Sequence, residues 1–173
     1  MSSSLELLIA EEEIRQKIAA VARKLDAFYA GEELTIVMVM KGAFCFTADL
    51  IREMKTPFTI ETIRASSYGN RGSERGELSI DGMEALDLTS KHVLLVDDIY
   101  DSGKTLSLIV SKFEEQGPKT LRTLVLLSKK VQKLTTYIPD EILFEIENTF
   151  VVGYGLDYKE HYRGLRGIYK MSL

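Results

Sequence analysis

The stretch VLLVDDIYDSGKT, Val93 to Thr105, joins an apolar run to two carboxylates and then to a Ser-Gly-Lys-Thr turn. The unbroken apolar run is typical of a strand that is covered on both faces. The turn places backbone N–H groups and hydroxyls at the start of a predicted helix, where phosphate is stabilised. Adjacent aspartates repel phosphate, but they accept hydrogen bonds from vicinal hydroxyls, directly or through a hard cation. A sugar phosphate would satisfy both halves of the stretch.

Strand and helix patterns alternate on both sides of this stretch. Apolar residues recur at steps of three and four in the predicted helices, and the predicted strands are short apolar or alternating runs. Strands that alternate with crossover helices predict an α/β fold with a mostly parallel sheet flanked by helices. The predicted helices are 11–29, 43–54 and about 106–113; the predicted strands are 36–40, 58–67, 92–98 and 121–128, with two further apolar runs in 136–155 and an edge strand at 167–169. Residues 67–82, rich in glycine, predict a mobile loop or the tip of a hairpin.

Length and composition predict one compact domain. The chain has 173 residues, of which 45% are hydrophobic. The net charge of -4, from 22 basic and 26 acidic residues, argues against general nucleic-acid binding. The single Cys45 cannot form an internal disulfide, and with only His92 and His161 the chain lacks the spacing of a zinc site. The N-terminal sequence lacks the basic region of a signal peptide, and the apolar runs are too short to span a bilayer, so we expect a cytoplasmic protein.

Polar residues follow the predicted strands at the points where each strand ends. Lys41 follows 36–40, Asp97 and Asp98 follow Val93–Val96, Lys129 follows 121–128, and Asp157 follows the run that contains FVVGYGL. Ligands of such sheets bind outside the carboxyl ends of the strands. We therefore expect these side chains to form one site at one edge of the sheet.

Two common nucleotide motifs are excluded. A Walker A loop, G-x-x-x-x-G-K-[ST], needs a glycine five residues before Gly103, and that position is Asp98. The run GYGLDY begins like a dinucleotide fingerprint, but the third glycine position is Tyr158 and no predicted helix follows. The turn is therefore an anion site of another kind.

The run VLLVDDIYDSGKTL resembles the phosphoribosyl-pyrophosphate signature of the type I phosphoribosyltransferases. More narrowly, the chain resembles the bacterial hypoxanthine-guanine enzymes of that family from Val37 to Leu165, in family order. MKGAFCFTADL resembles their pyrophosphate loop, SSYGN the start of their flexible loop, LLSK their purine-binding lysine, and FVVGYGLDYKEHYRGL their base-binding hood. The resemblance implies the type I phosphoribosyltransferase fold as a single domain, 1–173, with a small hood formed by the N-terminal segment and about 136–173.

The resemblance implies that Asp97 and Asp98 hold the ribose hydroxyls. It also implies that Asp101 exchanges a proton with the purine ring, as a general acid/base. The plainer interpretation of Asp101 is a helix N-cap, a common use of aspartate and one compatible with catalysis. The residues implied to wrap the 5-phosphate are Asp101, Ser102, Gly103, Lys104 and Thr105.

For the purine, the resemblance implies that Lys129 donates a hydrogen bond to the exocyclic oxygen. Phe150 and Val151 are implied to stack on the base and to read its edge, and Asp157 is placed in the same purine-binding group. The plainer interpretations are a solvated lysine in the run SKKVQK for Lys129, and an ordinary core aromatic for Phe150. An ammonium that is buried needs an acceptor, and a 6-oxopurine supplies one.

For pyrophosphate and metal, the resemblance implies backbone N–H groups from Lys41 and Gly42 and a contact from Arg163. In the family, the peptide bond before the lysine, here Met40–Lys41, can be cis. For Asp157 and Arg163, the alternative is a surface ion pair. The implied ligands of Mg²⁺ are Asp97, Asp98 and, through water, Asp157, and the implied closing residues of the flexible loop are Ser67 and Tyr68.

Together these features imply a magnesium-dependent purine salvage enzyme, a glycosyltransferase. It would convert hypoxanthine or guanine and phosphoribosyl pyrophosphate to IMP or GMP and pyrophosphate. Relatives are dimers or tetramers, so a homodimer or homotetramer is expected, with no nucleic-acid or membrane partner.

Two alternatives remain open at this point. The first is a related enzyme for xanthine or a pyrimidine; Lys129 and the hood sequence argue against pyrimidines but not against xanthine. The second is a regulator that keeps this core, senses phosphoribosyl pyrophosphate and binds RNA or DNA. Such a regulator should carry a clustered basic face, whereas lysine and arginine are dispersed among acids in this chain.

Overall fold

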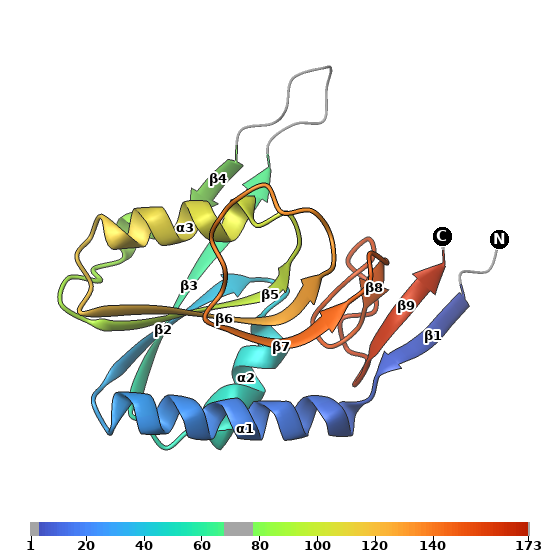
Figure 1. Cartoon of the computed structure of the whole chain (residues 1–173), viewed down its shortest axis with the longest axis horizontal. Coiled ribbons are helices and arrows are strands. Elements are labelled where there is room, and N and C mark those ends of the chain that lie inside the picture. The colour runs from blue at the N-terminus through green and yellow to red at the C-terminus, as the bar shows by residue number, and fades with distance from the viewer. Residues whose placement is uncertain (1–3, 68–77, 173) are drawn as a thin grey trace.

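The computed structural model of the chain describes residues 4–67 and 78–172. Within these residues, six strands form one sheet in the order β4-β3-β2-β5-β6-β7 (Figure 1). All neighbours in this sheet are parallel except β3 and β4. The strands are β2 (Leu34–Met40), β3 (Phe58–Ser67), β4 (Leu78–Asp81), β5 (His92–Tyr100), β6 (Thr120–Lys129) and β7 (Glu141–Ile146). The predicted α/β fold with a mostly parallel sheet is confirmed.

Helices cover both faces of this sheet. Helices α1 (Glu11–Tyr29) and α2 (Phe44–Glu53) lie on one face, α3 (Lys104–Glu114) lies on the other, and a short 3₁₀ turn spans Met83–Ala85 (Figure 1). The apolar stripe of α1, with Ile14, Ile18 and Leu25, is buried against the sheet. At its start, the backbone N–H of Ala10 donates to the Glu13 carboxylate at 2.9 Å, which satisfies one free helix-terminal donor.

The core has two layers, one on each face of the sheet, and β5 contributes to both. Leu94 and Val96 face α1 and α2, whereas Val93 and Leu95 face α3, and all four side chains are fully buried. This double burial explains why the run carries no polar residue before Asp97. The central strand therefore delivers its polar end to the carboxyl edge of the sheet.

Strand β5 is longer than the sequence pattern predicted. It continues through both aspartates to Tyr100, because Asp97, Ile99 and Tyr100 pair with β6. The prediction that the strand ends at Asp98 is wrong by two residues. The carboxylates are consequently held by a paired strand and not by a free loop.

A second, smaller sheet is built from both ends of the described chain. Its three strands, counted over the same residues, are β1 (Ser4–Ile9), β9 (Ile168–Ser172) and β8 (Val151–Val152), all antiparallel in the order β1-β9-β8 (Figure 1). The prediction that Gly167–Tyr169 forms an edge strand is wrong, because β1 pairs with the outer side of β9. The sequence pattern gave no strand at Ser4–Ile9, where five of six side chains are exposed.

The segment between β3 and β4 was expected to be a loop or a hairpin tip. The antiparallel pairing of Ser67 with Leu78 supports the hairpin, although residues 68–77 lie outside the described part of the chain. Over the residues that are described, no helix is long and apolar enough to cross a membrane.

Candidate active site

A cavity of about 350 Å³ opens at the carboxyl edge of the large sheet. Its walls come from the ends of β2 and β5, from the start of α3 and from the loop between β8 and β9. The predicted residues that line it are Lys41, Gly42, Asp97, Asp98, Thr105, Asp157 and Arg163. Segments that are far apart in the sequence thus bring acidic and basic groups to one concave surface.

Asp97 and Asp98 place two carboxylates at the floor of this cavity. Each carboxylate accepts one hydrogen bond from the next backbone N–H, Asp97 from Asp98 at 2.9 Å and Asp98 from Ile99 at 2.7 Å. Burial, followed by repulsion from Asp98, raises the pKa of the Asp97 carboxyl well above its ordinary value; burial also raises the pKa of Asp98. Two neighbouring carboxylates in such a place are destabilised when both are ionised. They therefore favour a ligand that donates hydrogen bonds from hydroxyls, or a cation.

The turn after β5 carries the predicted phosphate-binding residues to the start of α3. Gly103 begins the helix with a φ of 86°, and a Cβ there would lie 2.4 Å from Thr135 Cγ2, so both the backbone conformation and the space require glycine. The Ser102 carbonyl accepts from the Leu134 N–H at 2.8 Å. Lys104 is exposed and Thr105 lines the cavity.

Asp101 and Lys129 meet at the ends of the adjacent strands β5 and β6. The Lys129 ammonium lies 3.4 Å from the Asp101 carboxylate, and the exposed fractions of the two side chains are 14% and 53%. The largely buried stem of Lys129 excludes the interpretation of a freely solvated lysine. Gly103, not Asp101, is the N-cap of α3, so the plain N-cap interpretation of Asp101 is wrong.

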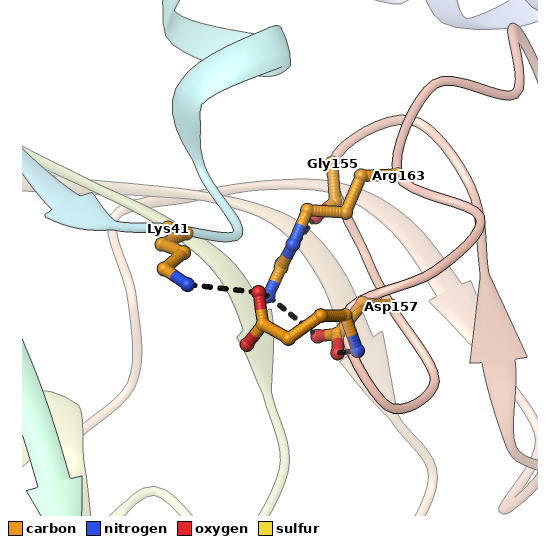
Figure 2. A network of polar contacts seen from close by, with 5 residues as sticks. Lys41, Gly155, Asp157 and Arg163 are labelled. Atoms are coloured by element: carbon orange, nitrogen blue, oxygen red, sulfur yellow. Dashed lines mark hydrogen bonds and ion pairs between the residues drawn. The ribbon is translucent and has the colours of Figure 1, made fainter.

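A network of charged groups joins Lys41 to the loop between β8 and β9 (Figure 2), and Lys41, Asp157 and Arg163 of this network line the cavity. The Arg163 guanidinium lies 2.9 Å from Asp157 and 3.4 Å from Glu160, and it donates to the Gly155 carbonyl at 2.7 Å. Glu160 also pairs with Lys41 at 2.8 Å, a contact that lowers the pKa of the Glu160 carboxyl. The ion pair considered as the alternative for Asp157 and Arg163 is therefore present, and it lies in the cavity wall.

Glycines allow three chain segments to meet at this point. A Cβ on Gly42 would lie 1.6 Å from the Asp98 carboxylate, and a Cβ on Gly155, whose φ is 98°, would lie 2.3 Å from the Gly42 carbonyl oxygen. A side chain at Gly42 would therefore displace the Asp98 carboxylate, and a side chain at Gly155 would require movement of the backbone. The peptide bond between Met40 and Lys41 is cis. The GYG run, rejected as a dinucleotide motif, thus serves close packing.

Of the remaining predicted residues, Phe150 and Val151 are not among the residues that line the cavity, and Tyr68 cannot be placed. Phe150 is 38% exposed and packs edge-to-face against Tyr158, at 5.7 Å between ring centroids, so it is not an ordinary core aromatic. Val151 is buried in β8. The backbone of Ser67 ends β3, while its side chain is not described and Tyr68 lies outside the described residues.

Sequence reasoning did not single out Glu160 or Lys133. Glu160 stands in the run DYKEHYRGL without a strand or helix pattern, and its role depends on the contact with Lys41, distant in the sequence. Lys133 lies among several lysines after β6, where composition alone favours a solvated side chain.

The donors at the cavity fit a magnesium ion. Among the described residues, no three acidic, histidine or cysteine groups are clustered closely enough to form a complete metal cage. Magnesium does not need one, because it keeps water ligands and binds through one or two carboxylates together with substrate phosphates. The buried Asp97 and the half-buried Asp98, both with raised pKa values, supply oxygen donors that a cation would stabilise.

Comparisons with known proteins agree with this geometry. The family model of the phosphoribosyl transferase domain matches residues 6–159. The chain is 37% identical to the hypoxanthine-guanine phosphoribosyltransferase of Aquifex aeolicus, covering 97% of this chain and 95% of that protein. It is 36% identical to the hypoxanthine phosphoribosyltransferase of Salmonella typhimurium, covering 100% and 98%.

The likeness extends to the fold. A crystal structure of a hypoxanthine-guanine phosphoribosyltransferase from Bacillus anthracis superposes with a TM-score of 0.86 at 35% identity, covering 99% of this chain and 100% of that one. The two folds therefore match over nearly the whole of both chains. The chain therefore belongs to the phosphoribosyltransferase family and, within it, to the hypoxanthine-guanine phosphoribosyltransferases.

Proposed function

We propose that the chain transfers the phosphoribosyl group of phosphoribosyl pyrophosphate to hypoxanthine or guanine, with Mg²⁺, giving IMP or GMP and pyrophosphate. One observation carries this purine-salvage function: two adjacent aspartates, the first turn of α3 and the Arg163 guanidinium line one cavity. These three groups complement a ribose diol, a 5-phosphate and a pyrophosphate, respectively. Family membership supplies the reaction class.

The ribose phosphate would lie along the end of β5. The carboxylates of Asp97 and Asp98 would accept hydrogen bonds from the two ribose hydroxyls. The 5-phosphate would bind the turn from Asp101 to Thr105, where the positive end of the α3 dipole and the Ser102 and Thr105 hydroxyls favour an anion. Position and electrostatics, more than covalent chemistry, would stabilise the separating charges.

The purine would lie between the end of β6 and the small sheet. The Lys129 ammonium, already close to a carboxylate, would donate to the exocyclic oxygen of the base. The ring of Phe150, a residue that is 38% exposed, would stack on the base, and the backbone of Val151 would read its edge. We propose that the N-terminal segment and about 136–173 form the hood of this single domain.

Proton transfer would be the role of Asp101. As a purine ring nitrogen forms its bond to C1 of the ribose, the bond from C1 to the pyrophosphate oxygen breaks. The ring proton passes to the Asp101 carboxylate, which returns it in the reverse reaction. The exposed carboxylate lies next to Lys129, the residue proposed to bind the same base.

Pyrophosphate would bind the backbone of Lys41 and Gly42 and the Arg163 guanidinium. Asp97, Asp98 and Asp157 would hold Mg²⁺, which, when bound, neutralises charge on the departing pyrophosphate. Ser67 and Tyr68 would close over the substrates and exclude water from the sugar cation that forms during transfer.

The test is a substrate panel. Purified protein, Mg²⁺ and phosphoribosyl pyrophosphate are incubated separately with hypoxanthine, guanine, xanthine, adenine and uracil, and nucleotide formation is followed. We expect turnover of hypoxanthine or guanine and none of uracil or adenine. Absence of turnover with hypoxanthine, guanine and xanthine would exclude salvage, and salt-sensitive nucleic-acid binding without turnover would favour a regulator.

We further propose a cytoplasmic homodimer or homotetramer. The low cysteine content and the resemblance to oligomeric enzymes support this assignment. Sedimentation equilibrium over a range of protein concentrations measures the oligomeric state, and a monomer at all concentrations would contradict it.

A further inference from the structure

Lys133 lies beside the proposed purine site but has no role in the function described above. Its ammonium donates to three backbone carbonyls, those of Tyr100 at 3.2 Å, Asp101 at 2.8 Å and Lys129 at 2.6 Å. The same ammonium lies 4.4 Å from the centroid of the Tyr100 ring. A lysine has three N–H donors, so these three carbonyls use its full capacity.

The three carbonyls belong to the ends of two neighbouring strands. The β5–β6 ladder ends at the pair of Tyr100 with Ser128, whereas Lys129 still pairs with Ile146 of β7. A backbone carbonyl beyond the ladder needs a donor from another group, because an unpaired polar group away from water is costly. The Lys129 carbonyl also accepts from the Val131 N–H at 2.9 Å. The Lys133 ammonium donates to all three carbonyls and so joins the end of β5 to the end of β6.

Two of the residues that Lys133 contacts, Asp101 and Lys129, are those that the proposed function places at the purine. The side chains of Asp101 and Lys129 extend from the backbone units that Lys133 holds, and they lie 3.4 Å apart. Small displacements of such groups slow the reaction strongly, since a shift of about 1 Å can lower the rate about 10²-fold. The hydrogen bonds from Lys133 therefore help to set the positions of the two side chains proposed to bind the base and to transfer its proton.

We propose that Lys133 is a positioning residue, which fixes Asp101 and Lys129 relative to each other by hydrogen-bonding their backbone carbonyls. This inference rests on the purine roles proposed for those two side chains. Lys133 touches neither substrate nor reacting atoms in this assignment.

Hydrogen bonds that do not involve the Lys133 side chain hold the proposed phosphate-binding turn and the residues beside it. The Leu134 N–H donates to the Ser102 carbonyl at 2.8 Å, and the Thr135 hydroxyl donates to Ser107 at 3.1 Å. The Tyr100 hydroxyl donates to the Tyr137 carbonyl. Asp101 is the first residue of that turn, but these contacts hold the rest of it when the Lys133 ammonium is lost, so the defect should be much larger for the purine than for phosphoribosyl pyrophosphate.

The experiment compares Lys133→Met, Lys133→Arg and Lys130→Met. Methionine keeps most of the stem and removes the donors, arginine restores donors, and Lys130 is an exposed neighbour that pairs with Glu147 at 2.8 Å. For Lys133→Met we expect kcat/KM for hypoxanthine to fall about 10- to 100-fold, with KM for phosphoribosyl pyrophosphate changed less than about two-fold. Lys133→Arg should recover most of the loss, and Lys130→Met should match the unmodified protein.

Hydrogen–deuterium exchange supplies a readout that needs no turnover. Faster exchange in Lys133→Met, confined to peptides around residues 99–102 and 128–131, is expected whether or not a base is converted. Unchanged exchange and kinetics would overturn the proposal, as would equal KM increases for both substrates or a Lys133→Arg variant as defective as Lys133→Met. Failure of the proposed function would appear instead as no oxopurine turnover by the unmodified protein.

Discussion

Glu160 lies where a substrate anion is proposed to bind. Its carboxylate contacts the Lys41 ammonium and the Arg163 guanidinium, and both of these residues line the cavity. An incoming pyrophosphate must therefore compete with a carboxylate of this chain. Because the Glu160 side chain is 64% exposed, solvent screens these contacts and makes the displacement easy.

Replacement of Glu160 by glutamine should strengthen pyrophosphate binding. Glutamine keeps the size of the side chain and removes the competing charge, so the inhibition constant of pyrophosphate should fall about two- to five-fold, the range of an exposed ion pair. Product-inhibition kinetics at fixed Mg²⁺ measure it. Glu147→Gln, which removes a similarly exposed acid paired with Lys130, is the control. Weaker pyrophosphate inhibition in Glu160→Gln would contradict the competition.

Asp97 illustrates a conflict between stability and binding in one side chain. The buried carboxylate is destabilised by its surroundings and by Asp98, as its raised pKa indicates. In protein without substrate and metal, Asp97→Asn should raise the melting temperature by about 2–4 °C, which corresponds to about 1 kcal/mol for a chain of this size. Phosphoribosyl pyrophosphate binding, measured by calorimetry with Mg²⁺, should weaken at least about ten-fold. A lower melting temperature would show that the charge is not costly.

At the scale of the element, Asp26 joins the end of α1 to the residues that follow α2. Its carboxylate accepts from the Thr56 N–H and hydroxyl, both at 2.8 Å, and from the Lys55 N–H at 3.0 Å. Burial raises the pKa of Asp26, but these hydrogen bonds outweigh it and leave the pKa below its ordinary value. The carboxylate form therefore stabilises the packing of the two helices.

The pH dependence of this contact follows from the direction of the shift. With a folded-state pKa below the unfolded one, the stabilisation is fully present above about pH 4 and is lost as the pH falls through the lowered pKa. Asp26→Ala should reduce the free energy of unfolding at pH 7 by about 2 kcal/mol. Urea denaturation at pH 7 and below pH 4 should show the difference shrinking with acid. Glu33→Ala, an exposed acid at the same end of the molecule, should show little change at either pH.

Elements were predictable where local pattern and burial agree. The bounds of α1 and β3 match the prediction, since α1 has a continuous apolar stripe and β3 is bounded by Pro57. The end of β5 was not predictable, because Ile99 and Tyr100 are strand residues only through pairing with β6. The strand β1 was missed for the same reason: its partner β9 lies at the opposite end of the sequence.

The residues of the candidate site were likewise predictable only where they form a local sequence pattern. Asp97, Asp98 and the turn from Asp101 to Thr105 form one continuous motif, and the sequence indicated them directly. Glu160 and Lys133 belong to no local pattern, and their contacts exist only after the strands and loops are assembled. Residues that act by charge or by holding backbone groups are therefore the ones a single sequence leaves unassigned.

At the scale of the whole molecule, the small sheet connects the two ends of the described chain with the proposed base site. Strand β9 pairs with β1 on one side and with β8 on the other, and Phe150 immediately precedes β8. The Met171 N–H donates to the Phe150 carbonyl at 2.9 Å. The N-terminal strand can therefore affect the proposed stacking residue without contacting the substrate.

Gly167 offers a way to test this connection. A Cβ at Gly167 would lie 2.8 Å from the Ile9 carbonyl oxygen and 3.0 Å from Leu7 Cδ1, whereas nothing lies within 4 Å of a Cβ at Gly164. Gly167→Ala should push β1 away from β9, lower the melting temperature by about 2–6 °C and raise KM for hypoxanthine several-fold more than KM for phosphoribosyl pyrophosphate. Gly164→Ala should keep both KM values and melt at the same temperature or slightly higher, because alanine restricts the unfolded chain. Matching behaviour of the two variants would mean that the small sheet does not transmit changes in β1 to the base site.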